Sequence, residues 1–465
     1  MQTTTQTIRR ILDAVGGDPD SVEHLVLTGP DAVLPSAFPV TSLATSAVAA
    51  ANLGLAAVLR RAASPGNATA GHPRVSVDRA QASAAFLSEA VFTPQGWDLP
   101  SPWDPLSGVY RSRDGWIRLH TNYGAHRAAA TAALGLAPDA TREEVAEHVL
   151  AVPGVELESA VLRAGGAAAV LHSRLGWLES VAGSATAQEP AVHAVVEGTS
   201  AWTPVPGGRP LEGLRALDLT RVIAGPLCTR FLAAHGADVL RLDPPGFQEV
   251  PALLPVTTQG KRRAFLDLAS PAGRERFLGL LSRAHVLVHG LRPGALEALG
   301  LDQGLLRAVA PGLVVARLDA YGWHGPWARR RGFDSLVQMS CGIADDGSRA
   351  AASDAPHPLP AQALDHSTGY HLAAGVLSLL GRGAAGTVTA SLVGAANLLY
   401  SMGPGGVPAV ASQAELRALL DGLREPVNTA WGDALAVPVP GTVDGAPVAF
   451  AHDAGPLGVD DAVWP

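Results

Sequence analysis

Asp365 is the residue whose type and position offer the most direct chemistry in this sequence. It stands at the start of an apolar helical stretch, LDHSTGYHLAAGVLSLLGR at 364–382, and is followed by His366 and Ser367 as candidate hydrogen-bond partners. Free backbone N–H groups and the helix dipole at such a place are expected to keep a carboxylate ionised and to steady an oxyanion. A carboxylate can accept an acyl group as a mixed anhydride. Aspartate is also a favoured helix cap, so the local sequence leaves both roles open.

Two short basic clusters are the next candidates for ligand contact. They are KRR at 261–263 and RRR at 329–331. Each suits a small polyanion, although most such charge runs are solvated surface. The chain as a whole has 34 Lys and Arg against 42 Asp and Glu, a formal charge of −8. Because it lacks the basic excess that a phosphate backbone attracts, we expect no nucleic acid partner.

Composition places the chain among folded globular proteins. Its 465 residues suggest two to three domains, and 47% of them are hydrophobic. The two cysteines, Cys228 and Cys341, lie in segments of apolar or small residues, so we expect neither a disulfide framework nor a metal cluster. Arginines interrupt the apolar positions near the N-terminus, and no apolar run reaches the ~18 residues of a membrane helix. These features predict a cytoplasmic protein without a membrane partner.

The second half of the sequence alternates between strand-like and helix-like segments after a Pro- and Gly-rich linker at 202–213. Helical stretches separate short apolar runs, and Ser270 and Pro271 are suited to start one of the helices. This alternation predicts an α/β fold with a Rossmann-like parallel sheet wrapped by helices on both faces. The expected strands are 214–220, 238–246, 263–268, 285–291 and 313–322.

The first half predicts a smaller α+β domain and a partial internal repeat. Residues 112–122 alternate like an antiparallel strand, and amphipathic helices are expected at 124–134, 141–151 and 156–164. Residues 41–87 and 364–399 share the order helix, short strand, helix, and both are rich in Ala. A chance likeness between Ala-rich helices is the alternative, but the shared order favours a true repeat.

Five segments between 211 and 400 resemble, in the same order, the Rossmann-like domain of the family III CoA transferases, a superfamily that includes α-methylacyl-CoA racemases. They are LEGLRALDLTRVIAGPLCTRFLAAHGADVLRLDPPG, QGKRRAFLDLASPAGRERF, HGLRPGALEALGL, AYGWHGPWARRRGFDSLVQMSCG and PLPAQALDHSTGYHLAAGVLSLL. No single segment is decisive, but five in order form a specific pattern.

This resemblance implies a site and a reaction. Asp365 matches the family's catalytic aspartate, which implies transfer of CoA between an acyl-CoA thioester and a small carboxylic acid. No tightly bound cofactor and no metal are expected, and the CoA thioester is a substrate. The residues that the resemblance assigns to CoA binding are Val222, Ala224, Lys261, Arg262 and the turn Leu291, Arg292, Pro293 and Gly294.

The order of the domains departs from the family pattern. Residues 108–136 resemble the family's small domain, which ordinarily follows the Rossmann-like part and here precedes it. We therefore predict a degenerate partial copy at 1–100, a small α+β domain at 101–205 and the catalytic domain at 206–465. Ala44 matches Asp365 in the degenerate copy. The resemblance implies a homodimer, although a duplicated chain can instead pair within itself.

Two alternatives to transfer remain open. Racemases of this superfamily use a histidine at the position that matches Phe333, and phenylalanine cannot move a proton. Racemisation is disfavoured, although His366 or His371 is a candidate base. A non-catalytic CoA-binding protein is the other alternative, because one copy is degenerate and several family positions differ.

Overall fold

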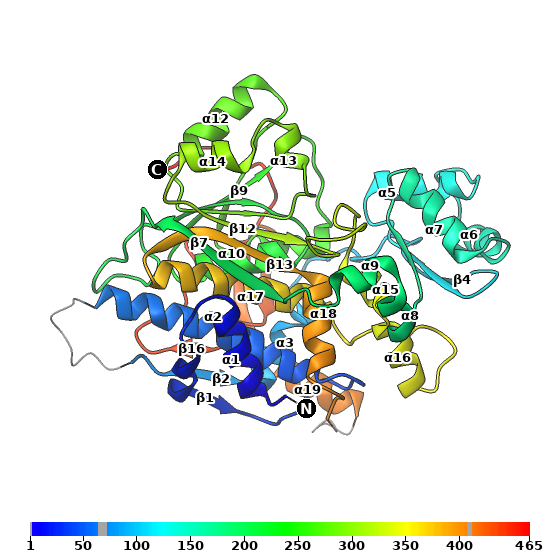
Figure 1. The fold of residues 1–465 in the computed structure, drawn as a ribbon, viewed down its shortest axis with the longest axis horizontal. Coiled ribbons are helices and arrows are strands. Elements are labelled where there is room, and N and C mark those ends of the chain that lie inside the picture. The colour runs from blue at the N-terminus through cyan, green and yellow to red at the C-terminus, as the bar shows by residue number, and fades with distance from the viewer. Residues whose placement is uncertain (1, 64–71, 407–411) are drawn as a thin grey trace.

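The computed structural model describes residues 2–63, 72–406 and 412–465. A seven-stranded sheet lies at its centre, parallel except at one edge (Figure 1). Its strands in spatial order are β10 (Lys261–Phe265), β9 (Asp238–Asp243), β8 (Arg215–Leu219), β11 (Val286–His289), β12 (Val314–Asp319), β13 (Ala384–Ser391) and β7 (Val192–Thr199). The first six strands run outward in both directions from β8 and β11, so the chain reverses its direction of travel across the sheet between these two strands. Parallel sheets of this kind bind ligands at that point, outside the carboxyl ends of the strands.

Alternate residues of the central strands enter two different cores. Ala216, Val239 and Val286 face the core that includes α10 (Ala224–Ala234) and α17 (Ala363–Gly381). Their neighbours Leu217, Leu240 and Leu287 face the core that includes α12 (Pro271–Leu281) and α14 (Gln303–Val309). Helices therefore cover both faces of the sheet, as Figure 1 shows, which confirms the predicted fold class.

The predicted strands of the second half all form, with shifts of one to three residues at their ends. The largest shift of a starting residue is at β10, which begins at Lys261 rather than 263. The sequence left Lys261 as either a surface charge or a CoA contact, and charged residues seldom lie in a buried strand. In the fold Lys261 pairs with Val239 of β9 and is fully buried.

The small domain has an antiparallel sheet of β4 (Gly108–Arg111), β5 (Trp116–Leu119) and β6 (Ala168–Val170). Helices α5 (Gly124–Ala133), α6 (Arg142–Leu150) and α7 (Gly154–Arg163) contribute to its own core, and Figure 1 shows them at the right beside β4. The predicted boundary at 205 follows β7, but β7 pairs antiparallel with β13 in the main sheet. The last strand of the predicted small domain therefore completes the large sheet.

The two halves of the internal repeat pack against each other. Helix α2 (Val40–Ala62) lies along α17, and a Cβ atom on Gly54 would stand 2.9 Å from the Leu377 side chain, so a glycine lets the helices approach closely. Strand β2 (Val75–Asp78) and helix α3 (Arg79–Ala85) follow α2, as β13 and α18 (Leu392–Ser401) follow α17. The chain thus packs the two segments of the predicted repeat against each other. By length and apolar composition α2 also meets the criterion for a membrane span, and most of it is buried in this fold.

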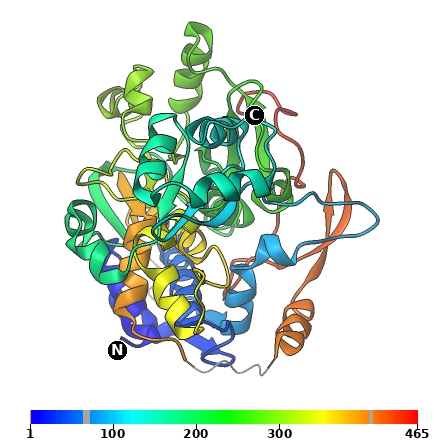
Figure 2. The ribbon, with the colours of Figure 1, turned by 90° about the vertical axis from the view of Figure 1, so that its right-hand side faces the viewer.

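The segment after α18 returns to the N-terminal part of the chain. Helix α19 (Gln413–Asp421) leads into a hairpin of β14 (Glu425–Thr429) and β15 (Gly432–Ala436), coloured orange at the right of Figure 2. Strand β15 also pairs with β3 (Thr93–Pro94), and β16 (Thr442–Val443) pairs with β2. Ala434 and Ala436 of the hairpin share a small core with Ile223 and Leu227 of the loop and helix after β8. The C-terminal segment thereby supports the loop at the carboxyl end of β8.

Candidate functional site

Asp365 lies in the first turn of α17, but another carboxylate caps this helix. The backbone N–H groups of Leu364 and Asp365 donate to Oδ2 of Asp334, at 2.8 and 2.9 Å. Asp334 begins α15 (Asp334–Ser340) and is itself buried. Because Asp334 satisfies these N–H groups, the Asp365 side chain does not cap α17. Its carboxylate instead reaches the walls of two cavities.

The surroundings of Asp365 disfavour its ionised form. Burial raises the pKa of Asp365 well above its ordinary value, and the negative charges of Asp334 and Glu89 raise it further. Burial likewise raises the pKa of Asp334 to about 6, against the hydrogen bonds that its carboxylate accepts. The prediction that the helix N-terminus keeps Asp365 ionised is therefore wrong. The free N–H groups that it invoked are bonded to Asp334.

Glu89 comes to the site from the N-terminal copy. It belongs to α4 (Ser88–Val91), and both of its carboxylate oxygens lie 3.0 Å from Nε2 of His366. Burial alone would raise the pKa of Glu89, but the His366 imidazole outweighs it and the pKa lies lower than usual. Phe86 stacks on the His366 ring at 5.1 Å between centroids. His366 is thus held by the N-terminal copy.

A chamber of about 190 Å³ opens beside Asp365 on the side of the small domain. Its wall is mainly apolar and aromatic, and includes Phe86, Leu87, Ala90, Trp103, His120, Tyr123, Ile223, Val250, Leu253, Phe333 and Pro360. Phe333 stacks face to face on His120, with ring centroids 3.6 Å apart. Such a chamber suits a small apolar acyl group.

Two histidines of the small domain stand near this chamber in their neutral form. Burial lowers the pKa of His120 to about 3, and the neighbouring His126 and Arg118 lower it further. Burial, with Arg331 and Arg292, lowers the pKa of His126 to about 4. A neutral imidazole of such low pKa is a weak base, because it binds a proton poorly near neutral pH.

A larger cleft of about 720 Å³ reaches Asp365 from the carboxyl ends of β8 and β11. Four of the predicted CoA-binding residues line it, and three arginines add positive charge. The predicted residues on its wall are Val222, Ala224, Leu291 and Arg292, and the added arginines are Arg221, Arg330 and Arg331. Arg330 is already paired with Glu158 at 2.7 Å. The cleft therefore combines close backbone approach with cations that can pair with phosphates.

The loop after β8 is held in a strained conformation. Val222 has φ +65°, which is costly for a β-branched residue. Its N–H donates to Oε2 of Glu249 at 2.9 Å, and Tyr123 donates its hydroxyl to Oε1 of the same carboxylate at 2.7 Å. Arg241 binds Glu249 in turn, at 3.2 Å. This network fixes the turn beside Asp365 and joins it to the small domain.

The other four predicted CoA contacts, Lys261, Arg262, Pro293 and Gly294, do not line these walls. The Lys261 ammonium is fully buried and donates to Asp218 Oδ2 and to the Pro226 carbonyl, both at 2.9 Å. Arg262 forms a paired hydrogen bond with Asp238. Gly294 takes φ +90° at the start of α13 (Ala295–Ala298). In this arrangement the Lys261 ammonium is bonded within the core. CoA contacts by the predicted residues that do not line the cleft stay predictions.

Sequence reasoning did not find Glu89, Asp334 and His120. They come from parts of the chain far from Asp365. Asp334 stood next to Phe333, and His120 lay in the expected strand at 112–122, but neither was singled out as a site residue. The structure also shows both cysteines buried and free. In residues 2–63, 72–406 and 412–465, no group of three His, Cys, Asp or Glu side chains is placed to hold a metal ion.

The part of this chain that is similar to known proteins includes Asp365. Residues 211–416 match the model of "CoA-transferase family III". "Probable fatty acyl-CoA transferase Rv3272" of Mycobacterium tuberculosis is 34% identical over 185 residues, which are 37% of this chain and 46% of that protein. "Formyl-CoA:oxalate CoA-transferase" of a Bradyrhizobium species is 32% identical over 182 residues, 37% of this chain and 42% of its own length.

A crystal structure of Rv3272 aligns with 42% of this chain and 58% of its own, at 32% identity and a TM-score of 0.38. "Acetyl-coenzyme A transferase nodX" of Hypoxylon pulicicidum is 34% identical over 176 residues, 37% of this chain and 30% of that protein. The matching segment spans less than half the length of these curated relatives. The similarity covers the Rossmann-like part and leaves out most of the N-terminal half.

Proposed function

Because this chain belongs to CoA-transferase family III through residues 211–416, we propose that it moves CoA between an acyl-CoA thioester and a carboxylic acid, with Asp365 as the acyl carrier. One observation supports this most strongly. The Asp365 carboxylate lies on the walls of both cavities, the arginine-lined cleft and the apolar chamber. A thioester with CoA in the cleft and its acyl group in the chamber would present its carbonyl carbon to Asp365.

The first half of the proposed reaction frees the donor acid. An oxygen of the Asp365 carboxylate attacks the thioester carbonyl carbon, the C–S bond breaks and the CoA thiolate leaves, which forms a mixed anhydride. The thiolate then attacks the Asp365 carbonyl carbon, so that the donor carboxylate departs and an aspartyl thioester remains.

The second half repeats these steps with the acceptor. The acceptor carboxylate attacks the aspartyl thioester and releases the CoA thiolate, which leaves the acceptor joined to Asp365 as an anhydride. The thiolate then attacks the acceptor's acyl carbon, and the products are a new acyl-CoA and the free Asp365 carboxylate. Each step exchanges one carboxylate or thiolate for another, so no oxidant or net proton is required.

The neighbours of Asp365 fit positioning roles in this scheme. Asp334 holds the first turn of α17 and so fixes where Asp365 points. The network of Glu249 fixes the Val222 loop, whose backbone borders both cavities. Arg292, Arg221 and Arg331 supply the cations for the phosphates of CoA.

Chemistry at the α carbon of an acyl-CoA is the second candidate, because His120 lines the chamber beside Phe333. The low pKa of His120, about 3, argues against it as a base. His366 is bonded to Glu89, and His371 is fully buried within α17. Exchange of the α hydrogen for deuterium in heavy water, without net transfer, would favour this candidate over transfer.

A covalent adduct tests the proposal directly. The protein is incubated with a mixture of acyl-CoAs, trapped with hydroxylamine or borohydride and digested, and the peptide that contains Asp365 is examined by mass spectrometry. We expect a hydroxamate or reduced side chain at Asp365 and none in the Asp365→Asn variant. If CoA binds and no donor yields an adduct, transfer through Asp365 is wrong and a CoA-binding protein or α-carbon chemistry takes its place.

The rate of CoA transfer should fall at low pH, because the Asp365 carboxylate must be ionised to attack the thioester. Burial, Asp334 and Glu89 raise the pKa of Asp365, so kcat/KM should fall as the pH drops through a value above the usual carboxyl range. Asp334→Asn removes one negative neighbour and keeps an oxygen that accepts the two N–H groups. In this variant the fall of kcat/KM on the acid side should therefore occur at a lower pH than in the wild type. The exposed Asp354→Asn serves as control, and a fall at the same pH in Asp334→Asn as in the wild type would contradict this electrostatic coupling.

A further inference from the structure

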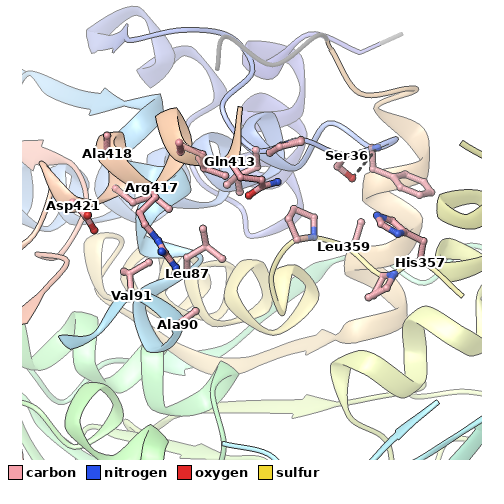
Figure 3. Close-up of a pocket in the computed structure, with 18 of the residues that line it drawn as sticks. Ser36, Leu87, Ala90, Val91, His357, Leu359, Gln413, Arg417, Ala418 and Asp421 are labelled. Atoms are coloured by element: carbon pink, nitrogen blue, oxygen red, sulfur yellow. Dashed lines mark hydrogen bonds between the residues drawn. The ribbon is translucent and has the colours of Figure 1, made fainter. Parts of the chain in front are cut away.

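We propose that a groove on the far side of the chamber holds the apolar tail of a long-chain acyl group, and that Leu87, Ala90 and Pro360 control its entry. This inference rests on the proposed function, because it assigns the substrate class of the same site. The groove encloses about 1,330 Å³, seven times the volume of the chamber. Figure 3 shows it between α4, α19 and the segment around Leu359.

The lining of the groove suits an alkyl chain. Apolar side chains come from four separate segments of the fold, and Figure 3 shows Leu87, Ala90 and Val91 along one wall with Ala418 above them. The polar side chains Gln413 and Arg417 also line it from α19, and both are exposed. The apolar members of the wall are Leu34, Pro35, Ala37, Phe38, Leu87, Ala90, Val91, Pro358, Leu359, Pro360, Ala414, Leu416, Ala418 and Leu420. Its further polar members are Ser36, Thr93, His357, Asp421 and Arg424. Each methylene of an alkyl chain that leaves water for this wall would favour binding.

The groove and the chamber share part of one wall. Leu87, Ala90 and Pro360 line both cavities, and Asp365 lies on the chamber side. Leu87 and Ala90 are three residues apart at α4, so they fall on the same helical face. Leu87 is half-buried and Ala90 is exposed, so neither is locked in the core. A tail that starts at Asp365 and outgrows the chamber therefore meets these side chains next.

The size of the chamber makes such an extension necessary for long substrates. Its volume of about 190 Å³ lies below the ~300–1,000 Å³ that is usual for sites of drug-sized ligands. A short acyl group fits there, and a long one needs further space. The groove is a neighbouring cavity that offers this space outside the arginine-lined cleft. It is larger than the cavity of about 520 Å³ that borders the chamber at Trp103 and Tyr123.

Most of this groove is built from parts of the chain that the family match leaves out. Residues 34–38 and 87–93 precede the matched segment, and 417–424 follow it. The predicted N-terminal copy has Ala44 at the position that matches Asp365, so it cannot carry an acyl group. In this inference it has a different role. It supplies the side chains that would select the length of the acyl group.

Two opposite substitutions test the groove. Leu87→Ala widens the passage, so the ratio of kcat/KM for palmitoyl-CoA to that for acetyl-CoA should rise about 10-fold. Ala90→Phe narrows it, so the ratio should fall by about the same factor. Leu419→Ala is the matched control, since Leu419 lies on α19 and is half-buried but does not line the groove. Equal ratios in all three variants, or shifts of Leu87→Ala and Ala90→Phe in the same direction, would overturn the inference.

Binding separates this inference from the proposed reaction. The same three full-length variants are titrated by calorimetry with palmitoyl-CoA and with CoA, a readout that requires no transfer. We expect the ratio of the two affinities to shift in opposite directions for Leu87→Ala and Ala90→Phe. Such shifts in a protein that transfers nothing would support the groove and contradict the proposed function. Unchanged affinity ratios in a protein that does transfer CoA would overturn the groove alone.

Discussion

Asp365→Asn should lower the rate of CoA transfer by about 10³-fold or more while CoA still binds. Asparagine has nearly the same shape, but its amide cannot form the anhydride on which the proposed reaction depends. The CoA cleft is lined mostly by other residues, among them Arg292 and Arg221, so affinity for CoA should change little. Transfer is measured with an acyl-CoA and a free acid, and CoA affinity by calorimetry.

The same variant should be more stable than the wild type above the ordinary carboxyl range of pH. In the wild type the folded pKa of Asp365 is raised, so the folded state binds the proton more tightly than the unfolded state does. Stability is therefore lost as the pH rises from the unfolded pKa toward the folded one, and an uncharged asparagine escapes this loss. Asp354→Asn, at an exposed site, should change neither rate nor stability. Full transfer by Asp365→Asn would exclude Asp365 as the carrier.

The central strands could be predicted because their residues repeat a simple pattern. β8, β9 and β11 are short and almost wholly buried, and helices of adequate length separate them in the sequence. The edge strand β7 was not predicted, since five of its last six residues are exposed and its partner β13 lies nearly 200 residues away. Neither the composition of β7 nor the residues next to it in the sequence predict its pairing with β13.

The site was predictable only where the chain resembles a known family. Val222, Ala224, Leu291 and Arg292 were predicted to border CoA, and they line a single cleft at the point where the sheet reverses direction. Glu89 could not be found in this way, because it reaches the site only through the packing of α2 and α3 against the second copy. The local sequence does not predict contacts between residues so far apart in the chain.

The burial of charge is a further property that the sequence hides. Asp334 was next to a residue already discussed, yet its role as the cap of α17 depends on a contact between residues 30 and 31 positions apart. Burial lowers the pKa of Lys261 to about 8 despite the neighbouring Asp218 carboxylate, which no composition rule for a basic cluster would suggest. Charged residues in one run, KRR at 261–263, therefore have different surroundings because a strand alternates its faces.

Lys261→Met should cost about 3–5 kcal/mol in the free energy of unfolding, because it leaves the Asp218 carboxylate charged and fully buried without its cation. Arg262→Met is the contrasting variant. Arg262 pairs with Asp238 nearer the surface, and such a pair contributes about 1 kcal/mol or less. Urea unfolding followed by tryptophan fluorescence compares the two. Equal losses of unfolding free energy in the two variants would show that the Lys261–Asp218 pair stabilises the fold no more than the Arg262–Asp238 pair does.

The folded fraction of Lys261→Met also tests the CoA contact that the family resemblance assigns to this residue. If the ammonium belongs to the core, as its bonds to Asp218 and Pro226 indicate, the folded variant should bind CoA within about two-fold of the wild type. If Lys261 instead turns toward a phosphate when CoA enters, affinity should fall about 10-fold or more, because a charge-assisted hydrogen bond is lost. Calorimetry below the unfolding midpoint distinguishes a core lysine from a ligand-binding one, and so decides whether the cleft arginines alone hold the phosphates.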